Sequence, residues 1–238
     1  MTGWTQDVWL GFDTETTGID VGHDRIVTSA LVVRESDGSI GSSRTWLADP
    51  GIEIPEQATA VHGITTEYAR EHGAPPAQVL DEVAQVIAGA LGSGAVLVAF
   101  NATYDLSILR AELVRHGLAT LEDRLGRDVS PVVDPLVVDR KVERFRKGKK
   151  TLEAMGEAYG VAANDAAHTA DGDVAHTLAV LEALTAKYPQ VAEMAAADLH
   201  RSQAAWHAEW AENFEEFLRG KGRADAHISR AWPVEPVA

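Results

Sequence analysis

Residues 8–18 read Val8-Trp9-Leu10-Gly11-Phe12-Asp13-Thr14-Glu15-Thr16-Thr17-Gly18, an apolar run that ends in two carboxylates. The run is apolar without alternation, which predicts a central strand covered on both faces. Asp13 and Glu15 lie two residues apart at its C-terminal end, so both side chains are expected on the same face. Acids are common at strand ends, and this pair alone fits solvated side chains as well as it fits a functional site.

The elements around this strand can be predicted from hydrophobic periodicity and from turn residues. Further strands are expected at residues 26–33, 43–47, 95–100 and 131–134, and helices at 65–71, 76–91, 103–116, 152–159 and 171–187. Three consecutive strands with short links favour an antiparallel meander, and the later strands alternate with helices. The sequence therefore predicts an α/β fold: a mixed five-stranded sheet, three antiparallel strands then two parallel ones, flanked by helices.

The C-terminal part is expected to be an addition to this main domain, which we place at residues 1–188. Apolar residues at helical spacing predict an amphipathic helix over 189–220, and 221–238 is expected to be an irregular tail. The aromatic side of that helix is expected to pack on the main domain, with a partner helix or a dimer contact as the alternatives. The residues of this stripe are Trp206, Trp210, Phe214 and Leu218.

The composition limits the chemistry that is open to the chain. Its 238 residues suit one α/β domain with an appendage, and they contain no cysteine. Disulfides and thiolate metal sites are therefore excluded, and a metal would bind to oxygen or imidazole ligands. The N-terminus does not resemble a signal peptide and no apolar run reaches the length of a membrane span, so we expect a cytoplasmic protein without a membrane partner.

The charge distribution is strongly uneven. The formal net charge is −15, which is unusual for a protein that binds nucleic acid. Residues 140–150, however, contain seven basic side chains and one acid, so this window carries +6 and the remainder −21. Such a chain would attract a phosphate backbone at one place and repel it elsewhere, which predicts modest, salt-sensitive binding. A solvated loop is the other interpretation of this basic segment.

Two further acids lie at predicted helix starts. Asp105 follows the fourth strand after Asn101-Ala102-Thr103-Tyr104, and Asp173 lies in the first turn of the last helix of the main domain. Acids are favoured at helix N-termini by the dipole, which would explain each of them singly. His168, five residues before Asp173, has no capping role, and its imidazole is suited to accept a proton near neutral pH.

These residues are expected to converge on one edge of the sheet, because each follows a strand or begins a helix at that edge. Four carboxylates, from Asp13, Glu15, Asp105 and Asp173, would suffice to hold two divalent ions about 3.5–4 Å apart. Hard oxygen donors favour Mg²⁺ or Mn²⁺. The sequence therefore predicts a two-metal phosphodiesterase site.

The order of these motifs resembles that of the DEDDh exonucleases, which include the proofreading subunit of bacterial DNA polymerase III and ribonuclease T. The resemblance rests on Asp13-x-Glu15, on Asn101-x-x-Tyr104-Asp105 and on His168-x₄-Asp173, and it spans about residues 7–185. Val61-His62-Gly63-Ile64-Thr65 is also similar to a segment of the proofreading subunit. The resemblance implies a ribonuclease H-like fold and a 3′→5′ exonuclease of single-stranded DNA that releases nucleoside 5′-monophosphates, in proofreading or repair.

The resemblance also implies residue roles. Asp13, Glu15 and Asp173 would hold the metal that activates water, and Asp13 would bridge to a second metal that Asp105 supports directly or through water. His168 would take the proton from that water.

Substrate contacts follow from the same resemblance. Thr16 would approach the terminal sugar, while His62 and Tyr104 would line the base or ribose pocket, and we include Asn101 of the same motif. Thr16 could instead cap a turn, and Tyr104 could be part of the core.

Three functions stay open at this point. The first is trimming of single-stranded DNA 3′ ends, alone or with a DNA polymerase as partner. The second is trimming of RNA 3′ ends, since no residue shows how a 2′-hydroxyl is treated. The third, a non-catalytic module that binds a partner through the C-terminal helix, fits poorly with an intact set of site residues.

Overall fold

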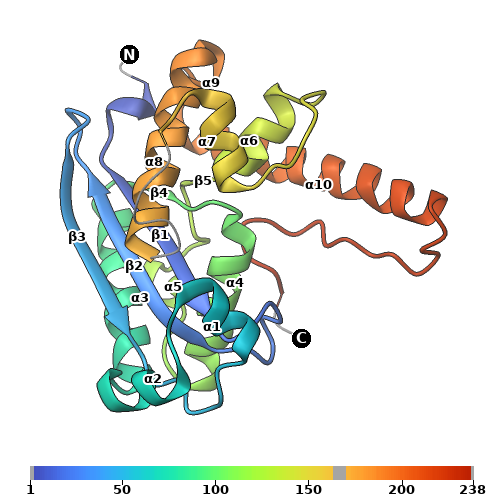
Figure 1. Cartoon of the computed structure of the whole chain (residues 1–238). Coiled ribbons are helices and arrows are strands. Elements are labelled where there is room, and N and C mark those ends of the chain that lie inside the picture. Colours follow the sequence, from blue (N-terminus) through green and yellow to red (C-terminus); the bar gives the residue numbers. More distant parts are fainter. Residues whose placement is uncertain (1–2, 163–169, 237–238) are drawn as a thin grey trace.

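A five-stranded mixed sheet forms the centre of the protein in the computed structural model, which describes residues 3–162 and 170–236 (Figure 1). The strand order is β3-β2-β1-β4-β5, in which β1–β2 and β2–β3 are antiparallel while β1–β4 and β4–β5 are parallel. The bounds are Trp9–Thr16 (β1), Ile26–Arg34 (β2), Ile40–Leu47 (β3), Val96–Val98 (β4) and Val132–Val133 (β5). The predicted mixed sheet is confirmed.

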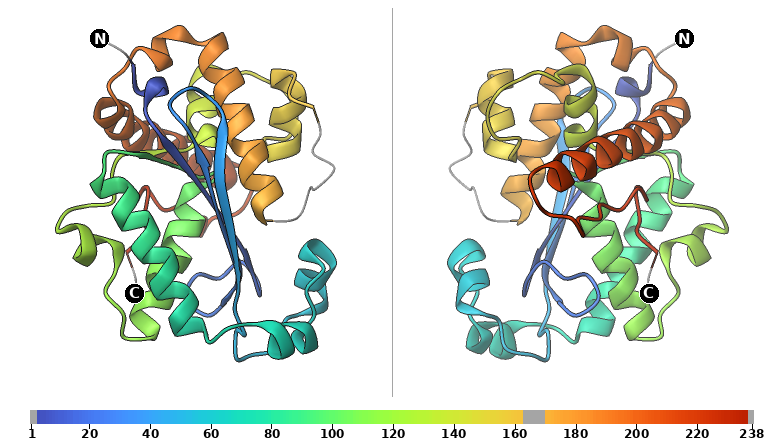
Figure 2. Two further views of the ribbon diagram at one scale, coloured as in Figure 1. Left: turned by 90° about the vertical axis from the view of Figure 1, so that its left-hand side faces the viewer. Right: turned by 90° about the vertical axis from the view of Figure 1, so that its right-hand side faces the viewer.

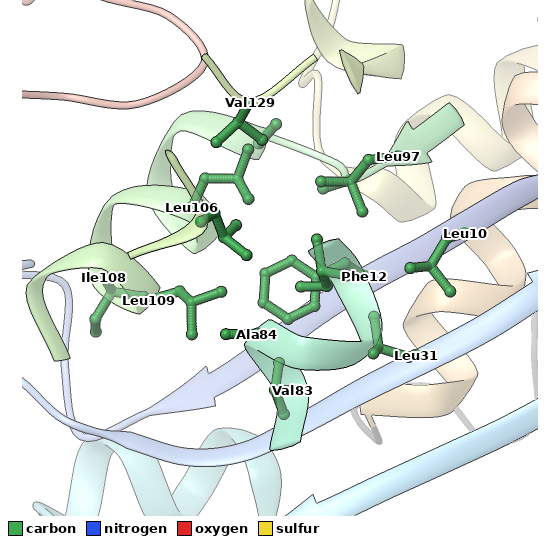
Figure 3. Close-up of a cluster of buried hydrophobic side chains, with 14 of the residues drawn as sticks. Leu10, Phe12, Leu31, Val83, Ala84, Leu97, Leu106, Ile108, Leu109 and Val129 are labelled. Atoms are coloured by element: carbon green, nitrogen blue, oxygen red, sulfur yellow. The ribbon is translucent and has the colours of Figure 1, made fainter. Parts of the chain in front are cut away.

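Strand β1 lies in the middle because it is apolar on both faces. Leu10 and Phe12 point to one side and are 2% exposed, and the Phe12 ring lies among Val83, Leu106 and Leu109 (Figure 3). On the other face Trp9 is fully buried in a second apolar cluster. Burial on both faces fixes the register of the strand, so the acids at its end have one defined position.

Helices cover both faces of the sheet (Figure 2). Pro76–Gly92 (α3) and Ala102–Arg115 (α4) contribute to the apolar cluster around Phe12, and Leu152–Tyr159 (α7) and Ala170–Lys187 (α8) contribute to the cluster around Trp9. These four helices were predicted, as was Thr66–His72 (α2). A short 3₁₀ helix at Trp4–Gln6 and the helices Glu56–His62 (α1), Leu121–Leu125 (α5) and Pro135–Val142 (α6) were not. The described residues contain no helix that is long and apolar enough to cross a membrane.

The C-terminal part differs from the expected single helix, because the chain forms Pro189–Ala192 (α9) and then Ala196–Gly220 (α10). The buried stripe of α10 is also not the aromatic one, since it consists of Leu199, Gln203, His207, Ala211 and Glu215. Trp206, Trp210, Phe214 and Leu218 are only partly buried. The helix is docked by polar groups instead: Gln203 Nε2 donates to Val132 O at 3.0 Å, and Val132 N donates to His200 Nδ1 at 3.1 Å.

The tail after α10 has no regular structure, yet it packs back along the molecule (Figure 1). The Glu215 carboxylate accepts hydrogen bonds from Ile228 N and from Arg230 Nη1, both at 3.0 Å. Trp232 is 8% exposed, and Glu235 N donates to Ser107 Oγ of α4 at 2.8 Å. The tail therefore forms a defined wall beside the start of α4.

Candidate active site

Asp13 and Glu15 stand in the last part of β1, opposite Ala30 and Thr28 of β2. Each offers a carboxylate oxygen that lies within 4.8 Å of the other and of an oxygen of Asp173. Asp173 comes from the first turn of α8, so a strand end and a helix start supply the three acids. This arrangement joins the two sequence motifs that were predicted to meet.

Gly11 allows α8 to lie close enough for Asp173 to reach β1. A Cβ atom at this position would stand 2.4 Å from Val174 Cγ1 and 3.2 Å from the Leu178 side chain. Those distances are shorter than an apolar contact allows. Gly11 was not among the predicted site residues, although a glycine inside an apolar strand is a signal of close approach by another segment.

The start of α4 is held by Asp134, which follows β5. Its carboxylate accepts hydrogen bonds from Asn101 N at 3.1 Å and from Ala102 N at 3.0 Å. Asn101 has a left-handed backbone, with φ 59° and ψ 43°. Such a backbone is uncommon outside glycine and turns the chain sharply from β4 into the helix. Asp134 thus directs α4, and with it Asp105, toward the end of β1.

Asp105 is 4% exposed and is bound to the strand that carries the other acids. Its Oδ1 accepts hydrogen bonds from Thr14 N at 3.0 Å and from Thr14 Oγ at 2.7 Å. Burial raises the pKa of Asp105 to about 7, and the two bonds from Thr14 act in the opposite direction. One carboxylate oxygen of Asp105 is therefore occupied, which fits a supporting role beside the group of three acids.

The acids share a strongly unfavourable electrostatic environment. The pKa of Asp13 is raised well above its usual value by burial first, and then by the charges of Asp105, Glu15 and Asp173. Burial and the charge of Asp173 raise the pKa of Glu15 to about 7. Within the described residues neither Asp13 nor Glu15 forms a salt bridge. A divalent cation would supply the missing positive charge, so this all-oxygen donor set fits Mg²⁺ or Mn²⁺.

Three of the predicted substrate residues also come together here. Thr16 Oγ lies 2.6 Å from the Tyr104 hydroxyl and donates to Gly18 O at 2.7 Å. His62, the last residue of α1, accepts a hydrogen bond from Ile64 N at its Nδ1. Burial lowers the pKa of His62, and a backbone hydrogen bond with Thr16 partly offsets this. Thr16, Tyr104 and His62 therefore lie close together beside the acids, where the predicted substrate contacts would be made.

The predicted roles of Asn101 and His168 receive no support from side-chain contacts in the described residues. Asn101 is exposed at the start of α4, and its backbone makes both of its described hydrogen bonds, to Asp134 and to Tyr104 N. His168 lies outside the described residues, so its role as the base stays a prediction.

The basic segment is largely engaged in contacts within the protein. Asp139, which is fully buried, binds Arg146 at 2.9 Å and also Lys150. Other bases of the segment contact α10: Lys141 and Arg144 pair with Glu209, and Arg140 lies over the Trp210 ring. In the described part of the chain Lys147 and Lys149 form no salt bridge, and both are exposed. The positive charge available to a phosphate backbone is thus smaller than the sequence suggests.

Comparison with protein families gives one match over most of the chain. Residues 10–181 match the profile of a family described as exonuclease (RNase_T). Among curated proteins, a DNA polymerase III subunit epsilon-like protein of Rhodobacter capsulatus is 36% identical over 184 residues, which are 74% of this chain and 24% of that protein. A PolC-type DNA polymerase III of Lacticaseibacillus paracasei is 29% identical over 176 residues, 74% of this chain and 11% of the polymerase. The chain thus spans a quarter or less of these relatives.

Solved structures with the same fold include exonuclease I. One of its structures has a TM-score of 0.68 at 21% identity and covers 77% of this chain and 42% of that one. Exonuclease I from E. coli in complex with a dT13 oligonucleotide has a TM-score of 0.67, again at 21% identity, and covers 78% of this chain and 42% of its own. These likenesses confirm the ribonuclease H-like fold.

Proposed function

This chain belongs to the exonuclease family, and from that membership we propose that it removes nucleotides one at a time from the 3′ ends of single-stranded DNA. The observation that carries the proposal is the group of Asp13, Glu15 and Asp173, whose oxygens lie within 4.8 Å of one another. These acids come from two elements, β1 and α8, and the pKa values of Asp13 and Glu15 are raised, which is typical of a site that needs a cation.

Asp13, Glu15 and Asp173 would hold one divalent cation, and Asp105 would support a second on the Asp13 side. When bound, such cations supply positive charge at the phosphate and lower the pKa of water. Thr14 keeps the Asp105 carboxylate in one orientation through two hydrogen bonds. This is the contribution of an outer partner that orients a ligand.

The neighbouring residues would orient the end of the strand. The Tyr104 pKa is raised by burial to about 12, so its hydroxyl stays neutral near pH 7. The hydroxyl donates to Gly18 O in this structure, and it would turn from that carbonyl to donate to a sugar oxygen. Thr16, which already contacts Tyr104, would bind the terminal sugar, and His62 would line the same place. His168 would take the proton from the attacking water, and the product would be a nucleoside 5′-monophosphate.

The preference for DNA is supported by the proteins that the chain resembles. The Rhodobacter capsulatus relative is named after a DNA polymerase III subunit, and exonuclease I has been solved with a dT13 oligonucleotide. A DNA polymerase as partner, as in proofreading, is proposed on the same ground. Because the chain spans only part of these proteins, RNA remains the second substrate to be tested.

The test is a digestion of 5′-labelled single-stranded DNA and RNA of equal sequence with Mg²⁺, Mn²⁺ or EDTA. Asp13→Ala is compared with Glu71→Ala, which removes an exposed acid on α2. We expect stepwise shortening from the 3′ end, dependent on metal, abolished by Asp13→Ala and unchanged by Glu71→Ala. The faster polymer identifies the substrate class. If neither polymer is shortened with either metal, the proposed function is wrong.

A further inference from the structure

A pocket of about 370 Å³ lies next to Tyr104, away from the group of three acids. One wall comes from the part of the chain that matches the exonuclease family. It consists of residues 19–21 in the loop after β1 and of Asn101, Thr103 and Tyr104 at the start of α4. The opposite wall comes from the C-terminal part, with His207 of α10 and Ile228, Ser229 and Glu235 of the tail. This second wall lies outside the residues that match the exonuclease family.

The C-terminal wall is a fixed part of the structure. Glu215 holds the tail at Ile228 N, and Glu235 N is bound to Ser107 Oγ. Between these points Trp232 is buried, with its ring centroid 5.0 Å from that of His200. A tail anchored at both ends and in the middle presents its side chains in one arrangement, as a binding wall requires.

His207 shows that this wall has an unused polar group. The side chain is 8% exposed, and its Nε2 lies 3.2 Å from Ser229 O. Since a carbonyl oxygen only accepts, Nε2 carries the proton in this contact, which leaves Nδ1 as an acceptor. In the described part of the chain Nδ1 has no hydrogen-bond partner. A buried acceptor without a donor costs stability, and the described part of the chain has other enclosed side-chain atoms without a partner, such as His62 Nε2 and Trp232 Nε1.

The lining indicates which part of a nucleic acid the pocket accepts. No lysine or arginine is among its lining residues, which include the two acidic residues Asp20 and Glu235. A phosphate would therefore be repelled. Ile19, Val21 and Ile228 supply apolar surface and Tyr104 supplies a ring, while the acids can accept hydrogen bonds. A nucleobase has these complementary properties, with apolar faces and N–H donors at its edge.

We propose that this pocket takes the base of the nucleotide that precedes the terminal one. The proposal rests on the proposed function. The pocket shares Tyr104 with the place where the terminal nucleotide would bind, and it contains none of the four acids. It therefore lies one step along the strand from the reacting phosphate, and its volume is in the range of small-ligand sites. The C-terminal part would thus set how the strand enters the active site.

The first test needs only the unaltered protein. Single-stranded oligonucleotides carry one abasic residue, either at the penultimate position or at the third position from the 3′ end. The p-nitrophenyl ester of thymidine 5′-monophosphate, which has a single nucleotide, serves as the reference substrate. We expect loss of the penultimate base to raise KM about tenfold, since one stacked base contributes on that scale, and loss of the third base to matter much less.

The second test fills the pocket. Ser229→Trp introduces a large side chain at a lining residue of the pocket. It keeps the Ser229 carbonyl and the Glu215 anchor, and it removes the 3.3 Å hydrogen bond from Ala231 N to Ser229 Oγ. Ser42→Trp, at an exposed position of β3, is the matched control. Ser229→Trp should raise KM for the intact oligonucleotide about tenfold and remove the effect of the penultimate abasic residue. Hydrolysis of the single-nucleotide ester should stay unchanged, as should every rate of the control.

The outcomes separate the two proposals. The assignment of the pocket would be wrong if metal-dependent hydrolysis had the same KM for the two abasic oligonucleotides. It would also be wrong if Ser229→Trp left the KM for the intact oligonucleotide unchanged. Either result would leave the proposed function intact. If no substrate, including the ester, is hydrolysed with Mg²⁺ or Mn²⁺, the proposed function falls and the pocket assignment falls with it.

Discussion

Asp13 and Asp139 are two acids removed from solvent to different degrees, and their surroundings are opposite. Asp139 in α6 is fully buried and is bound by Arg146, by Lys150 and by the Tyr159 hydroxyl at 2.9 Å. Asp13 at the end of β1 is surrounded by other carboxylates, and its pKa is raised by burial first and then by their charges. Within the described residues no salt bridge compensates Asp13.

The difference separates a structural acid from one that needs an external cation. A buried charge is tolerated where partners neutralise it, and Asp139 has those partners inside the chain. The acids around Asp13 would destabilise the fold unless a metal or protons neutralise them. The same comparison explains why part of the basic segment is unavailable to a substrate. Two of its seven basic residues form salt bridges with Asp139.

Replacing Asp13 should have the largest effect. Asp13→Asn is expected to lower exonuclease activity more than about 100-fold, beyond the range seen when an outer partner of a metal ligand is removed. The same variant should unfold at a higher temperature than the wild type in EDTA at pH 8, because one repelling charge is gone. Single-turnover digestion and thermal unfolding check the two parts. A lower unfolding temperature in EDTA would contradict the electrostatic account.

Asp139→Asn should give the opposite result. It leaves Arg146 and Lys150 without their buried partner, and breaking such a pair lowers the free energy of unfolding by about 3 kcal/mol. Activity per folded molecule should stay close to that of the wild type below the unfolding temperature. Urea denaturation measures the first quantity and an active-site-normalised digestion the second. If stability were unchanged, Asp139 would not be the structural acid described here.

Thr14→Val should have an intermediate effect. It removes the hydroxyl that donates to Asp105 at 2.7 Å and keeps the backbone donor at 3.0 Å. We expect Mn²⁺ affinity or activity to fall about tenfold, as for other outer partners. Thr14→Ser, which restores the hydroxyl, should recover most of the loss. Failure of serine to rescue would mean that the valine acts through packing.

Glu15→Gln should have the smallest effect of these variants on stability in EDTA, and this effect should appear as a pH dependence. The Glu15 pKa is raised from 4.5 to about 7 on folding, so the unfolded chain loses this proton at lower pH than the folded one. Glu15 therefore contributes stability below pH 4.5 that is lost as the pH rises through about 7. In EDTA the stability of the wild type relative to Glu15→Gln should fall across that window. A difference that is constant with pH would contradict the raised pKa.

Much of the sheet and the acidic site could be predicted from sequence, because local signals were strong. The apolar run before Asp13 marks a buried central strand, and acids at element boundaries marked the site. The residues that position them carried weaker signals. Thr14 and Asp134 each act through two hydrogen bonds, Thr14 to Asp105, 91 residues away along the chain, and Asp134 to the backbone of Asn101 and Ala102, 33 and 32 residues away. Such pairings cannot be derived from one sequence.

The C-terminal helix shows a second reason why parts of the structure could not be predicted from the sequence. Its aromatic residues predicted the buried side, yet α10 turns Gln203 inward. Gln203 and His200 satisfy the backbone of β5, which is the edge strand of the sheet. Unpaired backbone groups of an edge strand require partners, and this requirement outweighs the apolar stripe. It becomes visible only when the edge of the sheet is known.

The most direct test of the central claim is calorimetric titration of metal-free protein with Mn²⁺ at pH 7, in buffers of different ionisation enthalpy. Because Asp13 and Glu15 hold protons more tightly than usual, binding should release protons. We predict Mn²⁺ binding with proton release in the wild type and in Asp139→Asn, and loss of both in Asp13→Asn. Equal Mn²⁺ affinity in Asp13→Asn and the wild type would contradict the account.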